Sequence, residues 1–306
     1  MKKLSFVDSA SERGAKRVDI PLAMNEDRMI QAYNGVYAVI DGATSMIKAD
    51  MDGLTPAAYV AQFVVTWLYE NTRDIAPNTT AKELLIAVNN AFRDHVSEKF
   101  PDIAAQGKYG PSAAGVIVRL HSFGSYSYAQ VADCYLVERR RMDYYGVDQP
   151  DMYELLTPSQ LQGLDDGTLK KAHEKIAKGY PVEEILKEPT VAKKLKANRL
   201  FNNVRFGVIN GERAMENHIN AGTRCLSDVK SLILMSDGME DIAADPGFCK
   251  VETAAEQMVK YGVRTYWKQL RAVFDTDPNF TRWTRFKHMD DATGMVISFE
   301  DDQLDW

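Results

Sequence analysis

The sequence predicts an α+β fold in which strands and helices are segregated along the chain. Three observations support this. Short apolar runs rich in β-branched residues follow one another across brief polar turns, which is typical of antiparallel sheets. Amphipathic helical patterns occur in neighbouring pairs with no strand between them. The strand–helix–strand alternation that predicts a doubly wound parallel sheet is missing, so a layered sandwich is expected.

The first of these segments are a strand and a pair of helices. The run 35–40 is apolar and β-rich, and it stops at Asp41-Gly42, as expected of a buried strand that ends in a turn. Thr55-Pro56 combines a capping residue with proline at the first helical position. Thr80 and Glu83 form a capping box for a second helix. Each helix has one apolar face, so we expect a helical hairpin lying on a sheet.

The remaining elements continue the same pattern. Further strands are expected at 113–120, 126–131, 135–137, 231–235 and 294–299, and a second helix pair at 251–261 and 263–274. Between about 158 and 198 the pattern is helical and rich in lysine, with a thin apolar stripe. Such a segment is typical of a solvated helical insertion, and a lid facing a partner is the alternative.

Composition limits the classes of protein. The chain has 306 residues, a hydrophobic fraction of 45% and a formal net charge of −6. These values exclude a disordered or disulfide-scaffold chain and argue against nucleic acid or an anionic membrane as the main partner. Three widely spaced cysteines suggest reduced thiols. With no signal-peptide pattern and no run of about 18 apolar residues, a cytoplasmic protein is expected.

Acidic residues recur at the ends of the most apolar strands. Asp41 and Asp237 each follow a strand and precede glycine, Asp290 stands before the last strand, and Glu26-Asp27 precedes the first. Each alone is best interpreted as a turn. Together they predict converging carboxylates, which repel one another and need a cation.

The chemistry of such a centre follows from the ligand type. Carboxylate oxygens suit Mg²⁺ or Mn²⁺, and a pair of these ions about 3.5–4 Å apart can hold and deprotonate a bridging water. The same ions neutralise charge on a phosphoryl group. The residues alone therefore predict metal-assisted phosphoester hydrolysis.

A family resemblance sharpens this prediction. The segments 25–27, 39–42, 235–241 and 290–293 occur in the order typical of the metal-dependent protein serine/threonine phosphatases, the PPM or type 2C family. Weaker similarity covers 110–114, 130–136 and 156–160. The resemblance spans nearly the whole chain. It implies one domain over 1–306, built as a four-layer α-β-β-α sandwich of two antiparallel sheets flanked by helix pairs, with a lysine-rich helical flap at about 163–205.

The resemblance also implies roles for individual residues. Asp41 would bridge two Mn²⁺ or Mg²⁺ ions, the carbonyl of Gly42 would bind one of them, and Asp237 and Asp290 would hold the other. Glu26 and Asp27 would act through metal-bound waters. Asp133 would match the acidic position linked to a third metal. The catalytic set would be Asp41, Asp237 and Asp290.

The sequence departs from the family in several places. The arginine that grips the substrate phosphate is replaced by Leu22, so Arg17, Arg28 or a cation of the flap would have to substitute. The family's Gly-Asp-Ser is here Ala132-Asp133-Cys134. His288 could donate a proton to the leaving group, although a polar surface histidine is the simpler interpretation.

Three functions follow as hypotheses. The first is an active phosphatase in which a metal-bridging water or hydroxide hydrolyses phosphoserine and phosphothreonine in a phosphorylated protein partner, with the enzyme a monomer. The second is a non-catalytic pseudophosphatase that binds a partner through the same fold. The third is a phosphatase of small phosphoesters.

Overall fold

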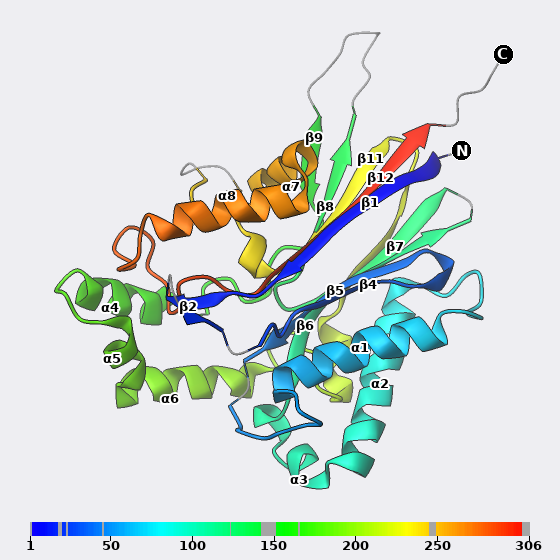
Figure 1. Ribbon diagram of the computed structural model, residues 1–306. Coiled ribbons are helices and arrows are strands. Elements are labelled where there is room, and N and C mark those ends of the chain that lie inside the picture. The colour runs from blue at the N-terminus through cyan, green and yellow to red at the C-terminus, as the bar shows by residue number, and fades with distance from the viewer. Residues whose placement is uncertain are drawn as a thin grey trace.

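Two antiparallel five-stranded sheets lie face to face, with helices on their outer faces (Figure 1). The computed structural model describes residues 2–17, 20–22, 24–44, 46–122, 124–141, 151–164, 166–244 and 249–301. The α+β sandwich predicted from the sequence is confirmed.

The first sheet has the strand order β10-β7-β6-β5-β4. Its strands are β4 (Arg28–Gln31), β5 (Val36–Ala43), β6 (Ser112–His121), β7 (Ser125–Val131) and β10 (Asn220–Cys225). The second sheet has the order β1-β12-β11-β8-β9. It consists of β1 (Lys2–Glu12), β8 (Tyr135–Arg140), β9 (Met152–Leu155), β11 (Val229–Met235) and β12 (Ala292–Asp301). A separate ribbon pairs β2 (Ala15–Arg17) with β3 (Ile20–Pro21).

Each sheet carries one helix pair. The pair on the first sheet is α1 (Pro56–Asn71) and α2 (Ala81–Lys99). Both predicted caps are present: the Ala58 amide donates to Thr55 Oγ1 over 3.1 Å, and Thr80 and Glu83 form the capping box. The pair on the second sheet is α7 (Lys250–Tyr261) and α8 (Val263–Asp275). The sequence pattern located all four helices to within about a turn.

The apolar core is divided into layers. One cluster joins α1 and α2 to the outer face of the first sheet, and another joins α7 and α8 to the second. Between the sheets, Val39 and Val116 of one share a cluster with Leu232 and Ile297 of the other. Helices, sheet, sheet and helices therefore form four layers.

Shorter helices complete the fold. They are α3 (Pro101–Ala104), α4 (Asp166–Ile176), α5 (Val182–Lys187), α6 (Pro189–Asn198), and the 3₁₀ turns η1 (Tyr33–Gly35), η2 (Gly107–Tyr109), η3 (Arg199–Phe201), η4 (Arg213–His218) and η5 (Asp237–Met239). The segment α4–α6 packs around a small core of its own, which Phe280 joins from the loop before β12. The predicted lysine-rich helical segment thus has a packed interior.

The N-terminal strand was not predicted. β1 pairs with β12 along almost its full length, although its sequence alternates weakly and most of its side chains are exposed or half-buried. It is an edge strand, so one side of its backbone needs no partner and little apolar pattern is required.

A charged network crosses the gap between the sheets. Glu138 on β8 is fully buried; it accepts a hydrogen bond from the Tyr126 hydroxyl of β7 and pairs with Arg140 and Arg224. Arg224 on β10 also forms two hydrogen bonds, of 3.0 and 2.9 Å, with the carboxylate of Glu154 on β9. Removing Glu138 would take this partner from Arg140 and from the buried Tyr126 hydroxyl, while Arg224 would keep Glu154.

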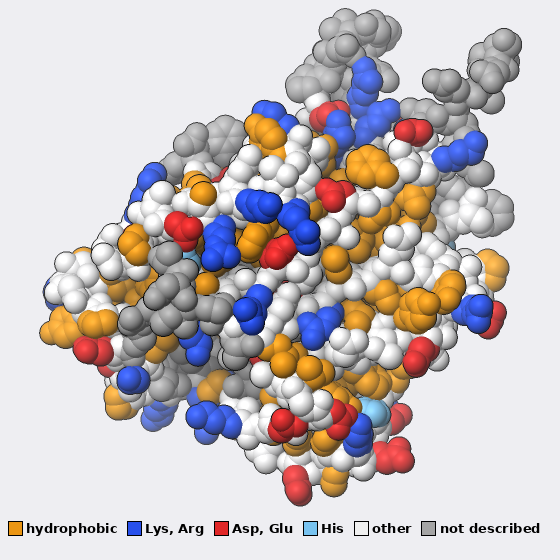
Figure 2. Space-filling model, in the orientation of Figure 1, with side chains coloured by type: hydrophobic (Ala, Val, Ile, Leu, Met, Phe, Trp, Pro, Cys, Tyr) orange, Lys and Arg blue, Asp and Glu red, His pale blue; other side chains and the backbone are white. Residues whose placement is uncertain are grey.

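The surface is mixed in charge. Figure 2 shows lysine and arginine side chains interspersed with acidic and hydrophobic ones on one face of the molecule. Among the residues that the structure describes, none of the helices has the length and apolarity needed to cross a membrane.

Candidate active site

Carboxylates from the first sheet meet at one end of the sandwich. The antiparallel register pairs Arg28 of β4 with Ile40 of β5, so the next residues, Asp27 and Asp41, are neighbours across the strands. Asp27 is only 1% exposed, and its Oδ2 accepts a 2.7 Å hydrogen bond from the Ser236 hydroxyl, which follows β11 in the other sheet. The two sheets are thus tied together at this point.

Carboxylates from the second sheet come to the same end. β11 pairs with β12, and beyond their last register pair the Ser236 amide donates to the Thr293 carbonyl over 2.9 Å. Asp237 follows one strand and Asp290 precedes the other. A β-carbon added at Gly238 would collide with the carbonyl oxygen of Asp291, so the two segments are in backbone contact.

Asp291 organises the backbone around the site. Its Oδ1 accepts a hydrogen bond from the Gly14 amide and its Oδ2 accepts one from the Glu26 amide, both over 2.8 Å. Glu26 is further held by the Thr55 hydroxyl, which donates to Oε1 over 2.5 Å. The second aspartate of the Asp290-Asp291 pair therefore fixes the loop that carries Glu26 and Asp27.

Gly42 lies where two chain segments approach closely. A β-carbon there would stand 2.6 Å from the Ala57 carbonyl oxygen and 2.7 Å from that of Glu26. Glycine is therefore required for α1 to begin this close to the strand end.

Burial and neighbouring charges raise the pKa of several carboxylates at this end of the sandwich. We refer to Glu26, Asp27, Asp41, Asp133, Asp237, Asp290 and Asp291 as the acidic cluster. Burial raises the pKa of Asp27 to about 8, and the charges of Asp290, Asp291 and Asp237 add to this effect. Burial also raises the pKa of Asp41 and of Asp237 well above the usual range, and each of these two is raised further by neighbouring carboxylates. These groups are close enough to repel.

Asp133 joins the cluster from the turn between β7 and β8. Burial raises its pKa to about 6; the charges of Glu240 and Asp290 add to this, and that of Arg199 opposes it. The preceding Ala132 has φ 62°, a conformation that favours glycine. Ala132 therefore adopts a backbone conformation that is usually taken by glycine.

The acidic cluster contains carboxylate oxygens without hydrogen-bond partners, but its side chains do not converge on a single point. Asp27 Oδ1 and Asp237 Oδ1 are buried and have no hydrogen-bond partner. Within the described part of the chain, no three acidic, histidine or cysteine side chains are drawn together as a ready cation cage. The oxygen-rich donor set and the orphaned oxygens fit a hard divalent cation.

Comparisons with known proteins identify the fold. No family model and no curated protein matches the sequence. Solved structures do match. The serine/threonine phosphatase Stp1 from Staphylococcus aureus has a TM-score of 0.56 at 16% identity, covering 98% of this chain and 96% of that one. PppA from Pseudomonas aeruginosa, a regulatory component of the T6SS, has a TM-score of 0.54 at 17% identity, covering 98% and 100%.

A third match carries the family name. The PPM Ser-Thr phosphatase MsPP from Mycobacterium smegmatis has a TM-score of 0.50 at 17% identity, covering 96% of this chain and 98% of that one. This chain has the PPM phosphatase fold. The resemblance inferred from the motifs is therefore confirmed at the level of the fold.

Two cations of this PPM-type fold lie at the acidic cluster. The ammonium of Lys287 donates a hydrogen bond to Asp290 Oδ1, and its charge lowers the pKa of Asp41 and of Asp237 against the larger effect of burial. Arg199, just after α6, donates from Nη2 to the Thr44 carbonyl over 2.7 Å and acts on Asp133. Neither residue was singled out from the sequence. The sequence offered only their positions as a signal: Lys287 lies shortly before the motif at 290–293, and Arg199 lies within the lysine-rich segment.

Of the two arginines predicted to bind the substrate phosphate, the structure describes the side chain of Arg28 but not that of Arg17. Arg28 donates from Nε to Gln62 over 2.8 Å and from Nη1 to the carbonyls of Asn25 and Asp27 over 2.8 and 2.7 Å. It therefore braces the loop that carries Asp27. The Arg17 side chain lies outside the described part of the structure, and its role stays a prediction.

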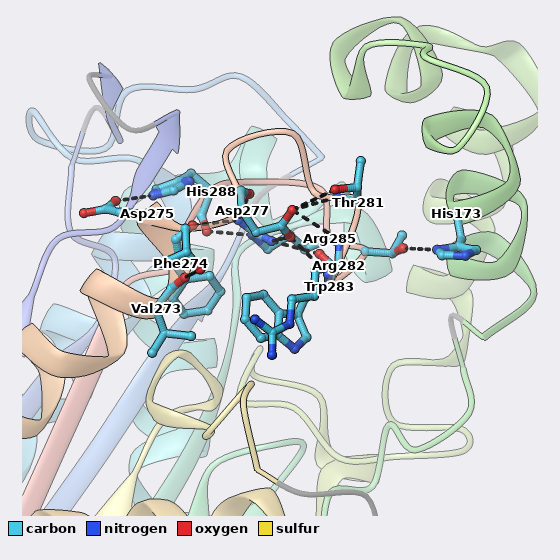
Figure 3. A network of polar contacts seen from close by, with 12 residues as sticks. His173, Val273, Phe274, Asp275, Asp277, Thr281, Arg282, Trp283, Arg285 and His288 are labelled. Carbon is cyan, nitrogen blue, oxygen red and sulfur yellow. Dashed lines mark hydrogen bonds and ion pairs between the residues drawn. The ribbon is translucent and has the colours of Figure 1, made fainter.

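His288 is not on the surface of the PPM-type fold. The surface interpretation was wrong: His288 is 1% exposed, and its Nε2 is 2.8 Å from Asp275 Oδ1 (Figure 3). It sits in a loop whose polar contacts hold Asp277, Arg285 and Trp283 together (Figure 3). This loop delivers Lys287 and Asp290 to the cluster.

Proposed function

We propose that this protein hydrolyses phosphate monoesters of serine and threonine in proteins, with Mn²⁺ or Mg²⁺ as cofactor. The observation that carries the proposal is the convergence of Asp27, Asp41, Asp237 and Asp290 from four chain segments of the two sheets. Two of their oxygens are buried without a partner, and keeping such groups without a cation would be costly. The likeness in fold to serine/threonine phosphatases supports the same conclusion.

The residues divide into ligands and supports. Asp41, the carbonyl of Gly42, Asp237 and Asp290 would hold two divalent cations, with Glu26 and Asp27 acting through water and Asp133 available to a third. Bound cations would lower the pKa of a water and neutralise the phosphoryl charge. Asp291 and Ser236 would keep the ligands in place through their hydrogen bonds to the Glu26 amide and to Asp27.

Arg199 is our candidate for the phosphate contact that Leu22 cannot make. It stands at the end of α6, where a guanidinium lies close enough to lower the pKa of Asp133. A guanidinium matches the geometry of a phosphate. In this proposal α4–α6 form the flap of a single domain, and Arg199 at its base couples the flap to the site.

One observation favours a non-catalytic binding module instead. Lys287 already neutralises part of the acidic cluster, so the fold could persist without a divalent cation. Under this alternative the cluster would be structural, and the flap would bind a partner directly.

Hydrolysis assays decide between the two. Purified protein with Mn²⁺ should hydrolyse an aryl phosphate and phosphoserine or phosphothreonine peptides, and EDTA should abolish turnover. Asp237→Asn should lower kcat about a hundredfold or more, while the exposed Asp228→Asn should not. Absence of turnover in protein shown by calorimetry to bind Mn²⁺ would contradict the proposal. Absence of both turnover and Mn²⁺ binding would favour the binding module.

A further inference from the structure

The acidic cluster contains a lysine whose position is fixed by its loop. Lys287 and Asp290 are ion-paired, and both side chains are 34% exposed. The contact therefore lies at the mouth of the site. The charge of Lys287 acts on Asp41 and on Asp237, whose Oδ1 is buried and has no hydrogen-bond partner. An ammonium group here faces the same carboxylates that would bind a divalent cation.

The residues next to Lys287 are anchored on both sides. Before it, Arg285 donates to Asp277 Oδ2 over 2.8 Å and to the His288 carbonyl over 2.9 Å. After it, the His288 amide donates to the Lys16 carbonyl over 3.1 Å, and the Met289 amide donates to the Ala15 carbonyl over 2.9 Å.

The loop itself is held by Asp277. This carboxylate accepts hydrogen bonds from the amides of Thr281, Arg282 and Trp283, over 2.9, 3.2 and 3.0 Å (Figure 3). The flap also reaches this loop, because His173 Nδ1 lies 2.7 Å from the Thr284 hydroxyl (Figure 3). The direction in which Lys287 leaves the backbone is therefore set by packed structure.

We propose that Lys287 is a built-in counter-cation that occupies Asp290 in the metal-free protein and competes with a divalent cation for that carboxylate. The inference rests on the proposed function only in taking Asp290 as a metal ligand. An oxygen of Asp290 that accepts from the ammonium must give up that bond to ligate a metal ion with the same lone pair. A second positive charge entering the cluster is also repelled by the first.

The inference has two measurable consequences. Replacing Lys287 by a neutral side chain should raise the affinity for Mn²⁺, because the competitor is removed. The same change should lower the stability of the metal-free protein, because the carboxylates then repel one another without compensation. A merely structural lysine would lower stability without raising affinity.

The experiment is a Mn²⁺ titration of the full chain by isothermal calorimetry, with free Mn²⁺ followed by electron paramagnetic resonance. Lys287→Met and Lys287→Gln are compared with the wild type, with Lys287→Arg, which keeps the charge, and with Lys268→Met, an exposed control on α8. We expect both neutral variants to bind Mn²⁺ about tenfold or more tightly, with a lower Tm in EDTA and a larger rise in Tm on adding Mn²⁺. Lys287→Arg and Lys268→Met should match the wild type.

The outcome is decisive in both directions. Equal or weaker Mn²⁺ affinity in whichever neutral variant folds would overturn the inference, and absence of binding in variant and wild type alike counts as equal affinity. Hydrolysis is measured separately on the wild type. If the wild type hydrolyses phosphoesters but the neutral variants bind Mn²⁺ no more tightly than it does, the role of Lys287 is rejected and the phosphatase proposal stands. If the neutral variants bind Mn²⁺ more tightly but the wild type shows no turnover, the role of Lys287 stands and the phosphatase proposal is rejected.

Discussion

Asp27 is a buried carboxyl group with an incomplete set of hydrogen bonds. Its carboxyl is almost completely removed from water, one oxygen accepts from Ser236, and the other has no partner. Burial and three neighbouring carboxylates raise its pKa to about 8. A group in this state is poorly stabilised as an anion without a nearby positive charge, which supports the divalent cation proposed above.

Arg199 allows a test at the same scale. Arg199→Ala should raise the KM for a phosphopeptide about tenfold with a smaller change in kcat, because it removes a phosphate contact made in both ground state and transition state. Steady-state kinetics would measure this, with the exposed flap variant Lys194→Ala as control. Unchanged KM in Arg199→Ala would rule out the contact.

The residues show where sequence reasoning succeeded and where it could not. The convergence of Asp27, Asp41, Asp237 and Asp290 was predicted because each stands next to the end of an apolar strand, and the structure brings them to one end of the sandwich. Their role as metal ligands stays a prediction. Lys287 and Arg199 were missed as individuals because a lysine or arginine in a polar loop is indistinguishable from a solvated one. Only the fold of the loop 276–291 turns Lys287 toward the carboxylates.

At the scale of elements, the loop 276–291 is held by one carboxylate. Asp277 is 3% exposed, and hydrogen bonds from three amides and from Arg285 outweigh burial and lower its pKa to about 2. A lowered pKa in the folded state means that the anion stabilises the fold. The charged form of Asp277 therefore stabilises the loop conformation.

Asp277→Asn should destabilise the protein at pH 7 by roughly 2 kcal/mol. The contribution of Asp277 is fully present above the pKa of the unfolded chain, near 4, and is lost as the pH falls through the folded value of about 2. Urea unfolding at pH 7, 5, 4 and 3 should show the gap between wild type and variant closing only below about pH 4. A gap that stays constant down to pH 3 would exclude this mechanism.

Other elements were predictable to different degrees. The helices were expected because caps and apolar stripes act locally, as Thr55 and Thr80 demonstrate. β1 was not, because an edge strand is specified by its partner β12 and not by its own pattern. The small core of α4–α6 was also hidden, since its apolar residues are spread among lysines and Phe280 reaches it from a distant segment.

At the scale of the whole molecule, the relative position of the two sheets determines the site. The acidic cluster draws its carboxylates from both sheets, so any slippage between the sheets would separate Asp41 from Asp237. Apart from the apolar layer, the buried Glu138 links the sheets through Tyr126 and Arg224.

Glu138→Ala should cost about 3–5 kcal/mol of unfolding free energy, because it takes the buried carboxylate away from Arg140 and the Tyr126 hydroxyl and leaves Arg224 with Glu154 alone. Urea unfolding followed by tryptophan fluorescence would measure it. Glu154→Ala, which removes a 40% exposed partner of the same Arg224, should cost about 1 kcal/mol or less. If both variants lose the same amount, the buried network does not hold the sheets together.

The backbone contact at Gly238 makes the sequences of two distant segments depend on each other. Because Gly238 rests directly on the carbonyl of Asp291, no side chain can be added at Gly238 unless the segment 291–292 moves away. A substitution in either of these two segments would therefore require a compensating change in the other, and we expect the two segments to vary together.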